Sequence, residues 1–196
     1  MNTLRIADLV FSVNQTTLIA TIQDGSLVWS LSVAASPRDV RGELWRPRAY
    51  SESLLDIEGM KLAGWRDAFE HELKWKDGCN EKARRSNASL FVFEHTAIYS
   101  STLKITAEPS GAFEITWRAK CDVFFDPYQD GLDLEIHASG IWEGVVVGSR
   151  GEDISSDEAA RRLRGHIQEG AFEFCPASDE FEYPLMRLPR PLVATG

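Results

Sequence analysis

Acidic side chains without nearby cations are the feature of the sequence with the clearest chemical meaning. No lysine or arginine lies between Cys121 and Ser149. A surface of this kind repels phosphate groups and attracts cationic partners or metal ions. The window therefore predicts a docking face for a basic protein partner. Its candidate partner-binding residues are Asp126, Asp130, Asp133, Glu135, Trp142 and Glu143.

The same window allows a second interpretation, a divalent-cation site or a metal-dependent enzyme that uses the acidic face from Asp126 to His137. In a strand, Asp133, Glu135 and His137 would project from one face at intervals of about 7 Å. Carboxylates beside an imidazole can perform acid–base or metal chemistry. Asp126 and Asp130 fit the start of a calcium loop, but position twelve is His137 and not the bidentate glutamate that an EF-hand requires. An EF-hand is therefore excluded, and the metal ligands stay unknown.

No recognisable catalytic or cofactor motif is present in the chain. Ser101 and Lys104 have the spacing of a serine–lysine nucleophile, which needs one turn of a helix. In a strand, residues three apart point to opposite faces, so the match is a coincidence. We therefore expect a non-enzymatic protein without a cofactor. Whether the chain catalyses a reaction is left open.

The composition predicts one soluble domain over residues 1–196. The net charge is −9, and residues 99–196 contribute −8 of it, from 9 basic and 17 acidic side chains. The basic run at 161–164 is explained by ion pairing within a helix, so we expect no nucleic-acid binding. No signal peptide and no run of roughly 18 apolar residues is found, which predicts a cytoplasmic protein and no membrane contact. The oligomeric state stays open.

The functional prediction combines this charge with the size of the chain. Small acidic immunity or inhibitor proteins that neutralise basic toxins have a similar charge and size. Opposed charge accelerates encounter with the correct partner and disfavours wrong ones. A non-enzymatic protein-binding module is therefore the leading hypothesis.

Alternation of apolar and polar residues predicts a mostly β fold. Leu27, Trp29, Leu31 and Val33 share one face of a strand over 26–35, and the dipeptide at 24–25 favours a two-residue hairpin turn to the strand before it. Further strands are predicted over 89–99, 102–107, 113–123 and 132–138, with another around 145–147. Together they predict a β-sandwich of about nine or ten antiparallel strands.

Other segments modify this fold. Residues 156 to about 169 form a predicted amphipathic helix, with Ser155 as the N-cap and Gly170 as the stop. Residues 56–75 fit either a strand pair or a second helix, and the helix would give an α+β domain. Residues 176–196 are predicted to be an extended proline-rich tail packed on the surface.

Aromatic and sulfur side chains complete the prediction. Cys121 has the inward phase of its strand, and the chain has three cysteines without a CxxC pair. We therefore expect Cys121 to be buried and unpaired. Trp45 and Trp142 lie next to turn residues, where they either cover the ends of the sheet or anchor a partner.

Overall fold

The computed structural model describes residues 2–23, 26–51, 72–80, 85–108, 110–125, 127–166, 172–178 and 182–188. Within these ranges the chain has fifteen strands and one helix. The prediction of a mostly β protein with one helix near the C-terminus is confirmed. No described helix has the length and apolar character needed to cross a membrane.

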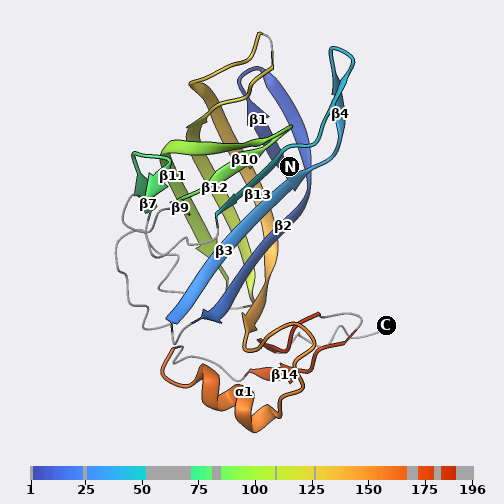
Figure 1. Cartoon of the computed structure of the whole chain (residues 1–196), viewed down its shortest axis with the longest axis vertical. Coiled ribbons are helices and arrows are strands. Elements are labelled where there is room, and N and C mark those ends of the chain that lie inside the picture. Colours follow the sequence, from blue (N-terminus) through green and yellow to red (C-terminus); the bar gives the residue numbers. More distant parts are fainter. Residues whose placement is uncertain are drawn as a thin grey trace.

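Eight strands of the described chain form a closed barrel (Figure 1). In spatial order they are β1 (Thr3–Ile6), β2 (Leu9–Gln23), β3 (Ser26–Ala35), β6 (Arg48–Ser51), β10 (Ser89–Phe91), β11 (His95–Ala107), β12 (Ala112–Cys121) and β13 (Leu132–Val146). Neighbours pair antiparallel, and β1 bonds to both β2 and β13. This double pairing closes the sheet, so the architecture differs from the predicted two-sheet sandwich.

Beyond the short β1, the strands β2 and β13 pair directly and run parallel, with Leu18 opposite Trp142. This pairing carries the barrel wall toward the part of the molecule that holds the helix. The strand β14 (Glu173–Cys175) pairs with β15 (Leu185–Arg187), and β15 pairs with the end of β13. The predicted tail thus contains a strand that joins the sheet, and residues after 188 lie outside the described ranges.

Besides β14 and β15, the described chain has three further strand pairings that are not part of the closed circuit. The strands β4 (Arg38–Val40) and β5 (Glu43–Trp45) form a hairpin, and β8 (Cys79–Asn80) pairs with β9 (Arg85–Ser86). The strand β7 (Glu72–Trp75) pairs with the second half of β11. The predicted alternatives for 56–75 concern residues outside the described ranges, apart from the last four, which are β7.

The barrel interior is filled by the inward side chains that alternation predicts. Trp29, Trp117 and Phe113 are among the largest fully buried side chains. An eight-stranded barrel has just enough interior for side chains. Trp117 keeps a hydrogen-bond partner in this interior, because its indole Nε1 donates to Ser101 Oγ at 2.6 Å. Large aromatic side chains therefore occupy much of the described barrel interior.

The predicted hairpin and meander are confirmed, with shifted boundaries. Gln23 pairs with Ser26 across the two-residue connection, and β10 to β13 pair in sequence order. The sequence predicts one strand over 89–99, but the chain bends at 92–94 and β11 then continues to Ala107. A bulge at Ser100, with φ of 48°, absorbs the irregularity that the sequence suggests as a break. The strands predicted at 132–138 and 145–147 are parts of the single strand β13.

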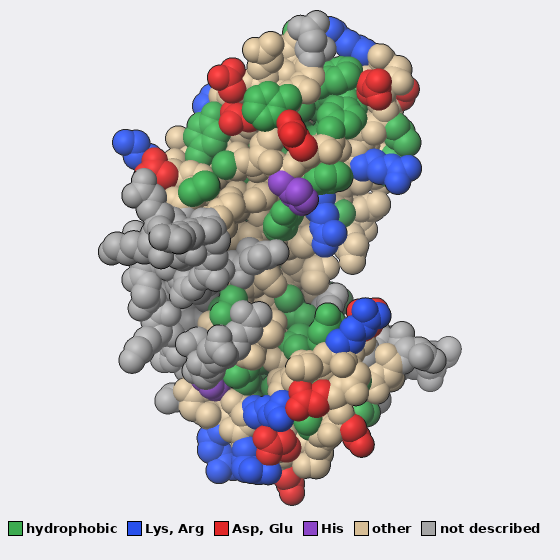
Figure 2. All heavy atoms as spheres, viewed as in Figure 1, with side chains coloured by type: hydrophobic (Ala, Val, Ile, Leu, Met, Phe, Trp, Pro, Cys, Tyr) green, Lys and Arg blue, Asp and Glu red, His purple; other side chains and the backbone are tan. Residues whose placement is uncertain are grey.

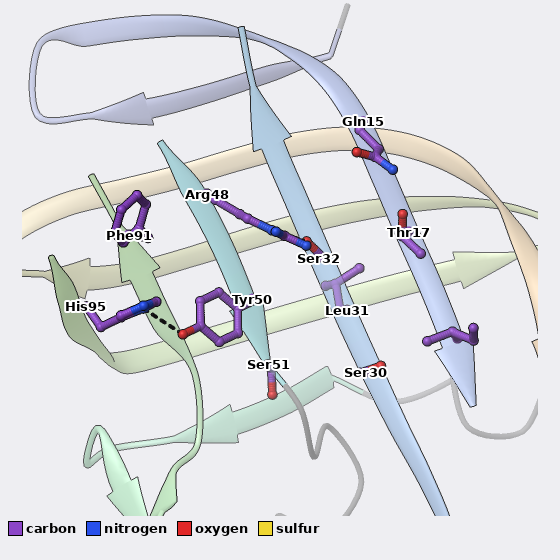
Figure 3. Close-up of a pocket in the computed structure, with 11 residues that line it drawn as sticks. Gln15, Thr17, Ser30, Leu31, Ser32, Arg48, Tyr50, Ser51, Phe91 and His95 are labelled. Atoms are coloured by element: carbon purple, nitrogen blue, oxygen red, sulfur yellow. Dashed lines mark hydrogen bonds between the residues drawn. The ribbon is translucent and has the colours of Figure 1, made fainter. Parts of the chain in front are cut away.

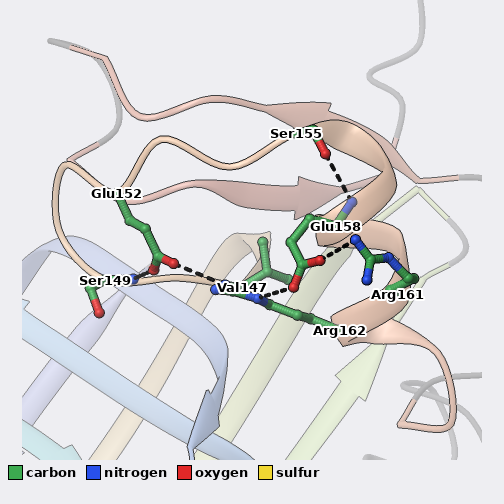
Figure 4. Close-up of polar contacts among 7 residues, drawn as sticks. All are labelled: Val147, Ser149, Glu152, Ser155, Glu158, Arg161 and Arg162. Atoms are coloured by element: carbon green, nitrogen blue, oxygen red, sulfur yellow. Dashed lines mark hydrogen bonds and ion pairs between the residues drawn. The ribbon is translucent and has the colours of Figure 1, made fainter.

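The helix α1 (Ser156–Leu163) begins where the sequence predicts and ends earlier. Ser155 is the N-cap, and its hydroxyl accepts a hydrogen bond from the Glu158 backbone N–H at 3.2 Å. The helix ends at Leu163 because the chain turns at Gly165, which has a φ of +91° that favours glycine. The predicted stop at Gly170 lies outside the described ranges. Arg162 anchors α1 to the loop after β13 (Figure 4).

Candidate functional site

The acidic face predicted from the sequence contains carboxylates that cations of neighbouring strands neutralise. Glu135 lies in β13 between β12 and β1, directly opposite Arg118 and Arg5 in the register of the sheet. Arg5 donates to one carboxylate oxygen at 2.5 Å, and Arg118 Nε donates to the other at 3.2 Å. His137 Nε2 lies 3.3 Å from the same oxygen as Arg118. These partners, with Arg5 first, lower the pKa of Glu135 to about 2.

Asp133 is paired in the same way. Lys120 of β12 lies opposite it and approaches its carboxylate at 2.8 Å, which lowers the pKa of Asp133. The sequence predicts an undiluted acidic face because no cation is near in sequence, but the register supplies cations from adjacent strands. That premise is wrong for Glu135 and Asp133. Asp130 is exposed and has no ion pair within the described chain.

The other predicted partner-binding residues are Asp126, Glu143 and Trp142. Asp126 and the side chain of Glu143 lie outside the described residues. The sequence predicts Trp142 as a partner contact, whereas its side chain is 3% exposed and stacks on Trp29 with ring centroids 5.5 Å apart. Trp142 lies in the part of β13 that pairs parallel with β2, and its side chain faces inward. It stabilises the core and presents little surface to a partner.

The divalent-cation site predicted between Asp126 and His137 can be tested only at the described residues of that segment. Among the described residues, no group of three or more His, Cys, Asp or Glu side chains could hold a metal ion. Asp122 instead accepts hydrogen bonds from the Tyr99 hydroxyl and the Gly131 backbone N–H, both at 2.9 Å. In this arrangement Asp122 stabilises the loop between β12 and β13.

Trp45 covers one end of the barrel. Its side chain is fully buried and contacts the rings of Phe11, Phe93, Phe125 and Tyr128, with centroids 5.4 to 6.1 Å apart. Of the two roles that the sequence allows for this tryptophan, the structure shows cover of the sheet end. The aromatic cluster seals the end of the barrel that carries the 122–131 loop.

A groove of about 700 Å³ lies on the outer wall of the barrel. Its floor is the outward face of β2, β3, β6, β10 and the start of β11 (Figure 3). We call this site the outer-wall groove. Alternation places short hydroxyl side chains there, together with four larger polar side chains, Gln15, Arg48, Tyr50 and His95. The residues that matter for its chemistry are Thr17, Ser30, Ser32, Arg48, Tyr50 and His95.

A hydrogen-bonded pair of ring side chains stands on one side of the groove. The Tyr50 hydroxyl lies 2.7 Å from His95 Nδ1, and the two rings meet edge to face with centroids 5.7 Å apart. Phe91 packs against the other side of the imidazole, at a centroid distance of 5.0 Å. The tyrosine and the phenylalanine restrict the orientation of His95, and its second ring nitrogen, Nε2, has no hydrogen-bond partner among the described residues.

Arg48 stands next to this pair and has only part of its guanidinium engaged. Its Nε donates to Ser32 Oγ at 2.9 Å, and Figure 3 shows the side chain extending from β6 toward Ser32 on β3. No described carboxylate pairs with it, and none of the described residues that line the groove is an aspartate or glutamate. A local positive charge thus faces solvent in a chain with a net charge of −9.

A second hollow of about 620 Å³ shares Ile19 with the groove and extends it toward α1. Figure 2 shows the molecule hollowed between the barrel and the part that carries the helix. Two arginines line this hollow, but both are neutralised: Arg150 pairs with Glu182 at 2.7 Å, and Arg162 pairs with Glu152 at 2.9 Å. Of the arginines that line these two sites, only Arg48 in the outer-wall groove has no carboxylate partner among the described residues.

Sequence reasoning does not identify Arg48, Tyr50 and His95 as a site. Arg48 and Tyr50 lie on β6, whereas His95 begins β11, 45 residues after Tyr50. One sequence pattern points to the groove. The outward residues of the strand over 26–35 include Ser30 and Ser32, which are polar but uncharged. Comparisons of the chain with protein-family models, curated proteins and solved structures found no match.

Proposed function

We propose that the protein is a non-enzymatic binding module that holds a ligand in the outer-wall groove. The observation that carries this proposal is the hydrogen bond between Tyr50 and His95 beside the partly engaged guanidinium of Arg48. A volume of about 700 Å³ lies in the range of small-molecule sites, which combine an apolar lining with a few fixed polar groups. Side chains oriented before binding reduce the entropy lost when a ligand is bound.

The chemistry of the groove favours binding over nucleophilic catalysis. An activated nucleophile needs a base within hydrogen-bond distance. The described partner of His95 is the phenol of Tyr50, and the Ser32 hydroxyl is engaged by Arg48. Ser51, the other serine near Tyr50, is 1% exposed and donates to the Asn87 carbonyl. The groove hydroxyls are therefore arranged as hydrogen-bonding groups for a ligand.

A fragment titration followed by amide and side-chain NMR tests this proposal. We expect fragments to shift resonances of Tyr50, Phe91 and His95 together. Tyr50→Phe removes the hydroxyl that orients His95 and should weaken binding of the same fragments. Thr106→Val, on the exposed face of the opposite wall, is the matched control and should leave affinity unchanged. Shifts that cluster elsewhere, or fragments indifferent to Tyr50→Phe, would contradict a ligand site in the groove.

The second candidate is the docking of a basic protein, as an immunity or inhibitor protein would do. Two exposed aromatics at the sealed end of the barrel support it: Phe93 is 43% and Phe124 is 65% exposed, and both line one narrow crevice. Asp130 and Glu94 are exposed on loops at the same end. Aromatic residues are enriched at protein interfaces, and acidic neighbours favour a basic partner.

Association kinetics with a captured partner test this second candidate. Asp130→Asn with Glu94→Gln should slow association at low salt, and added salt should remove the difference because exposed charges are screened. Phe124→Ser should instead accelerate dissociation. Asp133→Asn is the control, because Lys120 already neutralises that carboxylate. If none of the charge variants changes the association rate, Asp130 and Glu94 do not contribute to docking and serve only to keep the protein soluble.

A further inference from the structure

We propose that the ligand of the outer-wall groove is a small carboxylate with an apolar body, bound by Arg48 with His95 as the second donor. This inference rests on the function proposed above and names the chemistry of its ligand. Three observations support it: the charge of Arg48, the sheet register that relates Arg48 to His95, and the contacts of the imidazole of His95.

The first argument concerns the guanidinium of Arg48. Ser32 accepts a hydrogen bond from Nε, and the two terminal nitrogens have no hydrogen-bond partner among the described residues. Arg5, Arg118 and Arg162 pair with carboxylates, whereas Arg38, Arg41, Arg46 and Arg164 share with Arg48 the lack of a described carboxylate partner. Arg48 is the arginine of this second group that lines the groove. A guanidinium presents parallel donors that match a carboxylate, and such bidentate pairs are strong and geometrically specific. The groove supplies the cation for this pair and lacks a described carboxylate of its own.

The second argument is the sheet register. Arg48 lies directly opposite Phe91, and Phe91 lies directly opposite His95. Adjacent strands are about 4.8 Å apart, so the backbones of Arg48 and His95 are separated by roughly 10 Å with the phenyl ring between them. The Arg48 side chain extends toward Ser32 on β3, so a ligand that reaches both donors must span the groove from Arg48 to His95, with its apolar body against the phenyl ring (Figure 3).

The third argument is the orientation of His95. The Tyr50 hydroxyl can donate to Nδ1, and a neutral imidazole that accepts at Nδ1 carries its proton on Nε2. That N–H has no described partner in the protein and can donate to a carboxylate oxygen. Tyr50 thus acts as a positioning residue, and Arg48 and His95 are the residues that touch the ligand.

The charge of the site favours a carboxylate over a phosphate. One guanidinium compensates one negative charge, which matches a carboxylate, whereas a phosphate monoester carries about −1.5 to −2 at neutral pH. The described lining of the groove supplies one arginine and no lysine. A second uncompensated charge would meet the field of a chain whose net charge is −9.

Matched probes test this inference by calorimetry or NMR titration of the full chain. The probes are 3-phenylpropionate, its neutral amide 3-phenylpropionamide, and phenyl phosphate. We expect the carboxylate to bind at least about tenfold more tightly than the amide, the contribution of one charge-assisted hydrogen bond. Arg48→Gln should abolish this preference and leave the affinity for the amide unchanged. Arg118→Gln makes the same change of charge on the opposite wall and should retain the preference.

Each other outcome has a defined meaning. Equal affinity for the acid and the amide would overturn the carboxylate assignment and leave the proposed binding function standing. Tighter binding of phenyl phosphate that depends on Arg48 would replace the carboxylate by a phosphate. Absence of groove shifts with all three probes at millimolar concentration would count against the proposed function itself. The urea midpoint of each variant must match that of the unmodified protein, which separates loss of binding from loss of folding.

Discussion

Arg162 of α1 donates from Nη1 to the backbone carbonyl oxygen of Val147 at 2.8 Å, and this bond ties the helix to the end of the barrel wall. The same guanidinium pairs with Glu158 one turn earlier and with Glu152 in the preceding loop (Figure 4). The α1 helix has only eight residues and would be marginal alone. Its position therefore depends on this half-buried side chain.

Replacement of Arg162 by methionine should destabilise the protein by about 1 to 2 kcal/mol, because one variant removes hydrogen bonds to two carboxylates and a carbonyl. The urea midpoint measures this change. Arg161→Met is the matched control, since Arg161 is exposed and contacts only Glu158 among the described carboxylates. Equal shifts for the two variants would show that Arg162 is no anchor.

The N-cap gives a second prediction. Ser155→Ala removes the hydroxyl that accepts from the Glu158 N–H, and the expected loss is roughly 1 kcal/mol of unfolding free energy. Ser156→Ala changes the same chemical group one residue later, inside the helix, and should have little effect. If the two substitutions shift the urea midpoint equally, the cap assignment is wrong.

Glu135 gives a prediction about pH. Its pKa lies at about 2, lowered from 4.5 by Arg5 first and then by Arg118. A lowered pKa means that the ionised carboxylate stabilises the fold above about pH 4.5, and that this contribution is lost as the pH falls toward 2. Glu135→Gln should therefore cost roughly 1 kcal/mol near pH 7, in the range of partly exposed ion pairs, and little near pH 2.

Thermal or urea unfolding of Glu135→Gln at several pH values measures this difference. Asp130→Asn is the control, because Asp130 is exposed and has no ion pair within the described chain. A stability difference for Glu135→Gln that stays constant from pH 7 to pH 2 would show that the carboxylate charge is not responsible.

The cysteines give a fourth prediction. Cys121 is buried and free, which confirms the expectation from its inward phase, and burial first of all raises its pKa to about 12. The thiolate is the reactive form, so Cys121 should react slowly with a thiol reagent in the folded protein. Cys79 is exposed and should react quickly. Cys79→Ser should remove the fast phase of labelling. A fast phase that persists when Cys79 and Cys175 are both replaced by serine would contradict the burial of Cys121.

Local signals in the sequence account for the elements that were predicted correctly. The alternation that buries Trp29 and Leu31 depends only on the two-residue period of a strand, and the cap at Ser155 depends on contacts three residues apart. The hairpin between β2 and β3 follows from its two-residue connection. These features need no knowledge of distant segments, so the sequence by itself determined them.

Contacts between distant segments decided the rest. Closure of the barrel depends on β1 meeting β13, which pairs Arg5 with Glu135 across 130 residues of sequence and neutralises a carboxylate predicted to be bare. The same registers bury Trp142 and bring Arg48, Tyr50 and His95 onto one wall. Alternation specifies which face a side chain takes, but a strand pattern does not specify its neighbouring strands. The neighbours depend on long-range pairing, so only the tertiary structure placed the outer-wall groove.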